Sequence, residues 1–192
     1  LNLVSLYQEA AFKPYSKGKN EAPIPNHLDR QFDAKNPLEA IVTDLTYVRV
    51  KNRWAYVCFI IDLYNREIIG LSVGWHKTAE LVKQAIQSIP YALTKVNLFH
   101  SDRGKEFDNQ LIDEMLEAFD ITRSLSQAGC PYDNAVAEST YRAFKIEFIN
   151  QESFRTLEEL AAKTRDYVHW WNYHRIHGSL NYQTPMAIRL IA

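Results

Sequence analysis

Hydrophobic and polar residues alternate along this chain in two different periods. Residues 40–50, 54–63 and 67–75 are rich in Val, Ile, Tyr and Trp, and the triplets Lys-Asn-Arg and Tyr-Asn-Arg separate them. This pattern predicts three antiparallel strands joined by short turns. Apolar residues then recur at helical spacing over residues 78–89, with Thr78 as candidate N-cap and Pro90 beyond the end.

The second half of the chain predicts strands joined through helices. Residues 96–100 and 121–125 have the composition of short strands, and residues 109–119 between them have a helical period. Two long helices follow, one over residues 134–149 with Asp133 as candidate cap, the other starting at the capping box formed by Thr156 and Glu159. We therefore expect an α/β domain with a central five-stranded mixed sheet flanked by helices. This order of elements resembles a ribonuclease H-like fold.

The chain divides into three segments. Residues 1–37 mix short apolar runs with lysines and prolines and lack an initiating methionine. We interpret them as a linker that remains after an upstream region was removed. Residues 38–150 form the predicted core, and residues 151–192 are its predicted C-terminal helical extension.

Composition narrows the class of protein. With 192 residues, 46% of them hydrophobic, the chain is long enough for one well-filled core. No apolar run approaches the roughly 20 residues that span a bilayer, and no signal peptide is visible. Cys58 and Cys130 give neither a disulfide framework nor a metal-binding spacing, so we expect a protein of the cytoplasm.

The net charge of −1 does not by itself indicate a nucleic-acid partner. Its distribution is more informative, because Lys and Arg outnumber Asp and Glu in residues 1–35 and 161–192, whereas carboxylates dominate between them. Such a middle region suits a domain that gathers carboxylates around cations.

Three acids stand at positions that favour a common site. Asp44 lies inside the first strand, on the same side as Val42 and Val48 by period-two counting, where a carboxylate is costly unless something pairs with it. Asp102 follows the fourth strand, where Gly104 permits a sharp turn, and Glu138 lies one turn into a long helix. An isolated acid is more often a solvated residue or a helix cap, but Asp44 interrupts an apolar strand face, and Asp102 and Glu138 lie at junctions between a loop and an element. Folding can bring these three positions together.

The chemistry that uses such a cluster is phosphoryl transfer by two metal ions about 3.5–4 Å apart. Mg²⁺ prefers a few carboxylates, water and phosphate oxygens, so three acids suffice. Without metal the carboxylates repel one another, and we expect at least one raised pKa.

Several sequence runs resemble a known family. They are VTDLTY at residues 42–47, HSDRG at 100–104, PYDNAVAES at 131–139 and WNYHRIHGSL at 171–180 followed by Thr-Pro, and 35 residues separate the second acid from the third. Residues 38–190 thus resemble the bacterial insertion-sequence transposases, whose catalytic domain is similar to the retroviral integrase core of the Asp-Asp-Glu superfamily.

The resemblance implies a DNA transposase that cuts and joins DNA during integration of a mobile element. It implies that Asp44, Asp102 and Glu138 bind two Mg²⁺ ions, or Mn²⁺ in their place, and that water or a DNA 3′-hydroxyl attacks a phosphodiester. It also implies a basic residue seven positions after the glutamate, which is Lys145. Lys145 and Arg142 share the helix face of Glu138, so both are candidates to hold the DNA backbone.

The implied partners are double-stranded DNA, from mobile-element ends and target, and further copies of the chain on that DNA, with no membrane. Two departures stand out. Glu106 adds a negative charge near a DNA site, and the helix-turn-helix region expected upstream is absent. The chain would then do chemistry without choosing its own DNA ends.

Other polar and aromatic residues favour structural roles. For Asp62 a hydrogen-bonding role at a turn or sheet end is favoured over metal binding. The histidines 169, 174 and 177 lack a fourth zinc ligand at a recognised spacing. His100 either steadies the site or simply packs, and Cys58 is expected to be buried and inert. Trp171 belongs to the core by helical spacing, so we expect at most one of Trp170, Tyr173 and Tyr182 to contact DNA.

Two alternative functions remain open at this point. One is a ribonuclease H-type or junction nuclease, which would hydrolyse but not join strands. The other is a non-catalytic DNA-binding or assembly subunit. Strand-transfer product separates the first from a transposase, and metal-dependent cleavage separates the second.

Overall fold

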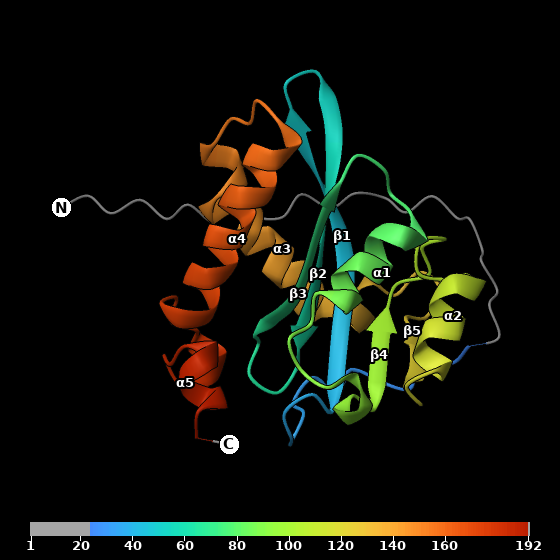
Figure 1. Ribbon diagram of the computed structural model, residues 1–192. Helices are drawn as coiled ribbons and strands as arrows, with labels where there is room; N and C mark the ends of the chain where they lie inside the picture. Colours follow the sequence, from blue (N-terminus) through green and yellow to red (C-terminus); the bar gives the residue numbers. More distant parts are fainter. Residues whose placement is uncertain (1–23, 192) are drawn as a thin grey trace.

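A computed structural model describes residues 24–191 and has a central sheet in the strand order β3-β2-β1-β4-β5 (Figure 1). The strands are β1 Ala40–Val50, β2 Arg53–Asp62, β3 Ile68–Gly74, β4 Leu98–Ser101 and β5 Thr122–Leu125. β1, β2 and β3 pair antiparallel, whereas β4 pairs parallel to both β1 and β5. The predicted five-stranded mixed sheet is confirmed.

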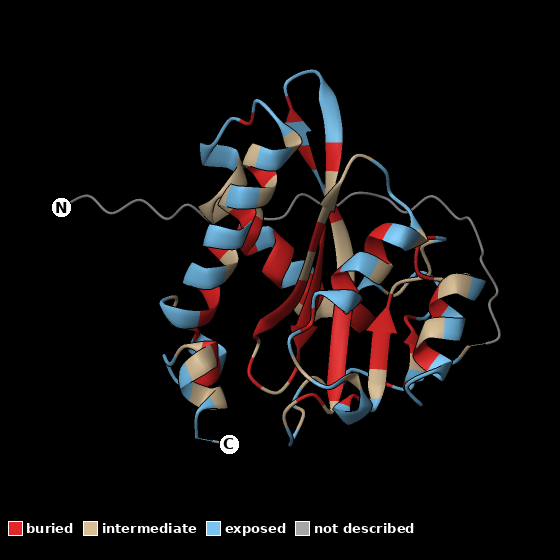
Figure 2. Ribbon diagram, viewed as in Figure 1, coloured by how far each residue is buried: buried red, intermediate tan, exposed pale blue. Residues whose placement is uncertain are grey.

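Helices cover both faces of this sheet. They are α1 Ala79–Gln87, α2 Gln110–Glu117, α3 Ala135–Glu147, α4 Leu157–Tyr173 and α5 Pro185–Arg189. α1 and α2 contribute buried residues to one hydrophobic cluster with the sheet, and α3 and α4 contribute to the other (Figure 2). Residues 57–61 of β2 are fully buried because both faces of this strand are covered, which explains their unbroken apolar run.

Hydrogen bonds at the helix starts agree with part of the capping predictions. Thr156 Oγ1 accepts from the Glu159 amide at 3.1 Å, and the Glu159 carboxylate accepts from the amide of Arg155 at 2.8 Å, one residue before the cap. Thr78 stands at the N-cap of α1 but makes no side-chain capping bond. The predicted capping box therefore forms, except that the Glu159 carboxylate accepts from the amide of Arg155 and not from the amide of Thr156.

The prediction that Asp133 caps α3 is wrong. Residues Pro131–Asn134 form a separate 3-10 turn, and Asn134 takes the N-cap position of α3. The Asp133 carboxylate accepts instead from Arg30 Nε at 2.7 Å and from the Gln127 amide at 2.9 Å. Burial opposes ionisation, yet these donors hold the pKa of Asp133 below its usual range.

The C-terminal part of the chain is fastened to the β2–β3 end of the sheet. The Asn172 amide donates to the Ile68 carbonyl and accepts from the Ile68 amide, both at 2.9 Å, as a neighbouring strand would. Trp171 is buried, as predicted, and its indole N–H donates to the Arg66 carbonyl at 2.9 Å. Asp62 has the predicted hydrogen-bonding role, because it accepts from the backbone amides of Leu38 and Tyr64.

Residues 25–28 lie beside β5. The amides of His27 and Leu28 donate to Ser124 Oγ, the Leu125 amide donates to the Pro25 carbonyl, and Leu28 is buried in the core. The rest of the predicted linker, residues 1–23, lies outside the described residues. Within residues 24–191, no helix combines the length and apolar character needed to cross a membrane.

Arg189 supplies the positive charge for two buried carboxylates where the C-terminal part of the chain attaches to the sheet. Its guanidinium lies 2.7 Å from Asp62 Oδ2 and 2.6 Å from Glu67 Oε2, and those carboxyl residues are only 0% and 4% exposed. Arg189→Met leaves both buried carboxylates without their counter-charge, so we expect the free energy of unfolding to fall by about 3–5 kcal/mol. Urea unfolding measures this, with the exposed Arg165→Met as control. Equal stabilities of the two variants would contradict the role of Arg189.

Candidate active site

The register of two parallel strands brings Asp44 and Asp102 together. Val42 of β1 is opposite His100 of β4. Asp44 and Asp102 each lie two residues further along, so both side chains project from the same face of neighbouring chain segments. Adjacent strands are about 4.8 Å apart, which sets the scale of the carboxylate separation.

Two hydrogen bonds from α3 place Glu138 above this pair. Asn134 Nδ2 donates to the Thr43 carbonyl at 3.0 Å, and the Tyr141 hydroxyl donates to the Asp44 carbonyl at 2.5 Å. Asn134 is four residues before Glu138 and Tyr141 three after it, so the three share one helix face. The helix is therefore attached to β1 on both sides of Asp44, and Glu138 faces that strand.

Tyr141 is a residue that the sequence analysis did not single out. Its side chain is buried, its ring stacks on Phe59 with centroids 5.1 Å apart, and its hydroxyl also accepts from the Phe59 amide at 2.6 Å. Phe59 is the partner of Asp44 in the β1–β2 register. The phenol thus joins β1, β2 and α3 at the position of Asp44. A tyrosine on the apolar stripe of α3 was the available signal, but its partner is 97 residues away.

The three carboxyl groups are electrostatically coupled. Burial raises the pKa of Asp44 to about 7, with Asp102 and Glu138 adding to the rise and the Leu45 amide opposing it. Burial also raises the pKa of Asp102 and of Glu138, and Asp102 adds to the rise at Glu138. Within residues 24–191, no three His, Cys, Asp or Glu side chains are arranged closely enough to enclose a metal ion as they stand.

Glu106 does not face the surrounding solvent. It is buried, and its carboxylate lies 2.6 Å from Lys77 Nζ. The charge that seemed unfavourable for DNA is therefore paired inside the protein. Gly104 has no positive φ; its amide donates to Asp102 Oδ1 at 2.9 Å, and a Cβ there would overlap the Glu106 carboxylate. A larger residue at this turn would therefore displace the Glu106 carboxylate.

His100 connects the two parallel strands that end at the site. Its ring nitrogens lie 2.8 Å from Ser124 Oγ and 3.1 Å from Ser126 Oγ, and burial lowers its pKa to about 4. The imidazole is therefore neutral near pH 7 and links β4 to β5, where it helps to fix the strand that leads to Asp102.

The two basic candidates on α3 differ in their surroundings. Arg142 is exposed and lies close enough to Glu138 to oppose the rise in its pKa. Lys145 is partly buried, with Nζ 4.5 Å from the centre of the Tyr47 ring. Lys145 is therefore held beside an aromatic ring, whereas Arg142 interacts with Glu138 from the surface.

The remaining histidines and Cys58 have structural environments. His177 packs against Trp171 with ring centroids 4.5 Å apart, and His169 contacts Tyr173 and His174 through their rings. No zinc-like cluster of these residues exists in the described part of the chain. Cys58 is buried, as predicted, and burial raises the pKa of its thiol to about 12. This thiol stays protonated at neutral pH and is unreactive.

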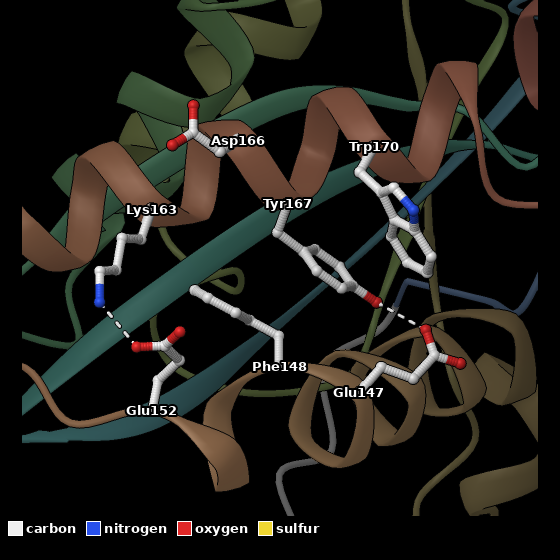
Figure 3. A pocket seen from close by; sticks show the side chains of 7 residues that line it. All are labelled: Glu147, Phe148, Glu152, Lys163, Asp166, Tyr167 and Trp170. Carbon is white, nitrogen blue, oxygen red and sulfur yellow. Dashed lines mark hydrogen bonds and ion pairs between the residues drawn. The ribbon is translucent and has the colours of Figure 1, made fainter.

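A hollow lies between the end of α3 and α4, away from the three acids (Figure 3). It has a volume of about 360 Å³ and is walled by Phe148, Tyr167 and the exposed Trp170. Two of its three carboxylates are paired, Glu147 with Arg175 and Glu152 with Lys163, both at 2.6 Å, and the third belongs to Asp166. None of the three coupled acids lines this hollow, so it is separate from the candidate active site.

Comparison with known proteins identifies relatives of the whole described domain. A family model described as "Integrase core domain" matches residues 34–131, and a second model with the same description matches residues 119–185. Transposase InsF for insertion sequence IS3A of Escherichia coli is 30% identical over 177 residues, covering 88% of this chain and 62% of that protein. A transposase for insertion sequence element IS904 of Lactococcus lactis is 28% identical over 191 residues, covering 96% and 76%.

The fold is also found among solved structures. The catalytic core domain of HTLV-2 integrase, solved in complex with magnesium, matches with a TM-score of 0.58 at 16% identity, covering 80% of this chain and 97% of that one. This likeness confirms the ribonuclease H-like fold. The chain spans 62% of the length of the E. coli transposase that it matches.

Tyr141→Phe tests the attachment of α3 to β1. The change removes one hydroxyl and leaves the Phe59 amide and the Asp44 carbonyl without this partner, so we expect a loss of about 1–3 kcal/mol in the free energy of unfolding. The control is Tyr56→Phe, whose hydroxyl has no hydrogen bond in residues 24–191. Chemical denaturation of both variants gives the answer, and an unchanged Tyr141→Phe would show that the bridge adds nothing.

The raised pKa of Asp44 makes stability depend on pH. A carboxyl whose folded pKa is about 7 binds a proton in the folded state that the unfolded chain has already lost, so the free energy of unfolding falls as pH rises from about 4 to about 7. In Asp44→Asn this fall becomes shallower. Above pH 7 the variant is therefore more stable than the parent, and below pH 4 the difference disappears. Urea unfolding in the presence of a chelator measures both curves; parallel curves would contradict the assignment.

Proposed function

Because this chain belongs to the integrase core domain family, we propose that it is the catalytic core of a DNA transposase that cleaves and joins DNA strands during integration of a mobile element. The observation that carries the proposal is the meeting of Asp44, Asp102 and Glu138 from β1, the end of β4 and α3, with coupled and raised pKa values. Desolvated acids that repel one another are costly to fold, so their presence favours a function that uses them.

The donor set suits divalent metal ions. All three side chains offer carboxylate oxygens, the ligands that Mg²⁺ and Mn²⁺ prefer, and a bound cation relieves the repulsion that raises their pKa values. We therefore assign Asp44, Asp102 and Glu138 as the ligands of two Mg²⁺ ions per active site, with Mn²⁺ as a substitute. Bound there, the metal ions supply Lewis acidity for the attacking and leaving oxygens of the phosphodiester.

The protein's own groups then hold the acids and the DNA. Tyr141 and Asn134 fix Glu138 relative to Asp44, and the β1–β4 register fixes Asp102. Lys145 and Arg142 lie on the same helix as Glu138 and are assigned to the DNA phosphates. Since the reactive hydroxyl belongs to water or to a DNA 3′-end, no covalent link between protein and DNA is needed.

The wider assignment follows from the same reaction. The partners are double-stranded DNA from the mobile-element ends and the target, and joining two ends requires at least two copies of the chain on that DNA. The named relatives are bacterial, so we place the reaction in the cytoplasm with the chromosome. Residues 38–150 serve as catalytic core, residues 151–192 as its helical extension, and residues 1–37 as a linker.

A gel assay tests the proposal. Labelled mobile-element end DNA and a target plasmid are incubated with Mn²⁺ and the parent, Glu138→Gln or the control Glu117→Gln, a change on the exposed side of α2. We expect joined product from the parent and the control, and at least a 100-fold loss in Glu138→Gln, since removing a preorganised transition-state contact costs about that much. Shortened strands without joined product would favour a nuclease. Equal product from all three proteins would reject the acidic site.

A further inference from the structure

A groove lies along the edge of β1 beyond the last residue that β4 covers. β4 pairs with β1 only as far as Val42, and at the far end Val50 forms a bridge with Phe154. Between these points no strand within residues 24–191 lies beside the edge of β1. The groove there has a volume of about 300 Å³ and is lined by Tyr47, Val48, Arg49, Trp54, Lys145, Ile149, Asn150, Glu152 and Phe154.

The two elements that lead into this groove, β1 and α3, also carry two of the candidate acids, Asp44 and Glu138. Tyr47 is three residues beyond Asp44 on β1, a rise of about 10 Å, and Lys145 is seven residues beyond Glu138 on α3, also about 10 Å. Lys145 Nζ lies 4.5 Å from the centre of the Tyr47 ring, so the two elements meet again at this point. The groove therefore begins within about three nucleotides of the carboxylates, at roughly 3.4 Å per nucleotide.

The lining combines exposed aromatic rings with cations. Tyr47 is 56% exposed and Trp54 49%, and their rings meet edge to face with centroids 5.1 Å apart. They belong to the projecting end of the β1–β2 hairpin, whose tip Figure 2 shows as exposed. Large aromatic rings on a surface cost free energy unless a partner covers them. Stacking on unpaired bases is one way to cover them.

The charge of the groove is complementary to a nucleic-acid backbone. Arg49 Cζ lies 5.0 Å from the centre of the Trp54 ring, and neither Arg49 nor Lys145 has a carboxylate partner among residues 24–191. The groove's one carboxylate, Glu152, is 2.6 Å from Lys163 Nζ and is therefore neutralised. The cations next to the rings remain available for phosphates.

We propose that this groove binds unpaired nucleotides of the DNA strand that passes through the active site, with bases stacked on Trp54 and Tyr47 and phosphates held by Lys145 and Arg49. The inference deepens the proposed function and rests on it. Single-stranded DNA fits this groove better than duplex DNA, because a duplex hides the faces of its bases. The exposed rings offer π-surfaces on which unpaired bases can stack.

Fluorescence anisotropy tests the groove with labelled duplexes that are blunt or carry unpaired 3′ extensions of one, three and six nucleotides. The parent should bind more tightly as the extension grows to about three nucleotides and gain little beyond that. Trp54→Leu should lose roughly 5- to 50-fold of this advantage, the effect of one lost stacking platform. The control is Phe119→Leu, which removes an exposed aromatic ring just beyond the end of α2 and should keep the full advantage. Circular dichroism melting verifies that both variants fold.

Equal binding of blunt and extended duplexes by the parent, or an unchanged advantage in Trp54→Leu, would overturn the inference. A change in the sedimenting mass of Trp54→Leu with no change in its preference would make the groove a contact between protein copies, which also overturns it. The parent's binding to the blunt duplex and its sensitivity to Glu138→Gln in strand joining test the proposed function separately. Failure of the groove is therefore distinguishable from failure of the transposase assignment.

Discussion

The repulsion between three carboxylates is the constraint around which this domain is organised. Burial raises the pKa of each of these groups, and neighbouring acids of the cluster add to the rise at Asp44 and Glu138, so the folded chain holds them together against their own electrostatics. The positions are set by backbone geometry: a parallel register fixes two of the acids, and a helix attached to β1 on both sides of Asp44 fixes the third. The groups that attach the helix are a neutral amide and a neutral phenol. Neither adds charge to the cluster, and neither competes with a cation for it.

The other buried carboxylates of the described domain differ from the three candidate acids in having a cationic partner. Acids that serve the fold are paired with arginine or lysine, as Asp62 and Glu67 are with Arg189 and Glu106 is with Lys77. Acids that serve the candidate chemistry have no such ion pair within residues 24–191. An unpaired, desolvated carboxylate is therefore a better indicator of function in this chain than the mere density of acids, which is high throughout the middle region.

Local patterns in the sequence predicted most of the fold, because strand alternation, helical periodicity and capping residues act over a few positions. The five strands and the long helices were found in this way, and so were the burial of Cys58 and the core position of Trp171. The errors and omissions involve distant partners. Asp133 was assigned to a helix cap, but Arg30, more than 100 residues away, takes its carboxylate. Tyr141 and the Tyr47–Lys145 contact depend on how α3 crosses the sheet, which no local period encodes. The sequence indicates the three acids by their positions, Asp44 on an apolar strand face and the other two at junctions between elements, and the family resemblance supports them. Their mutual placement follows from the strand register and from the attachment of α3.

The Asn172 side chain of α4 also changes the outer edge of β3, where it binds the backbone of Ile68. An outer strand normally presents free N–H and C=O groups, and such an edge invites another chain to pair with it and aggregate. Here one side chain of α4 occupies both groups of Ile68, and the helix itself covers the strand. The start of the β3 margin is thereby protected from lateral strand addition, and a second chain approaching there would meet the side chains of α4 before any free backbone group.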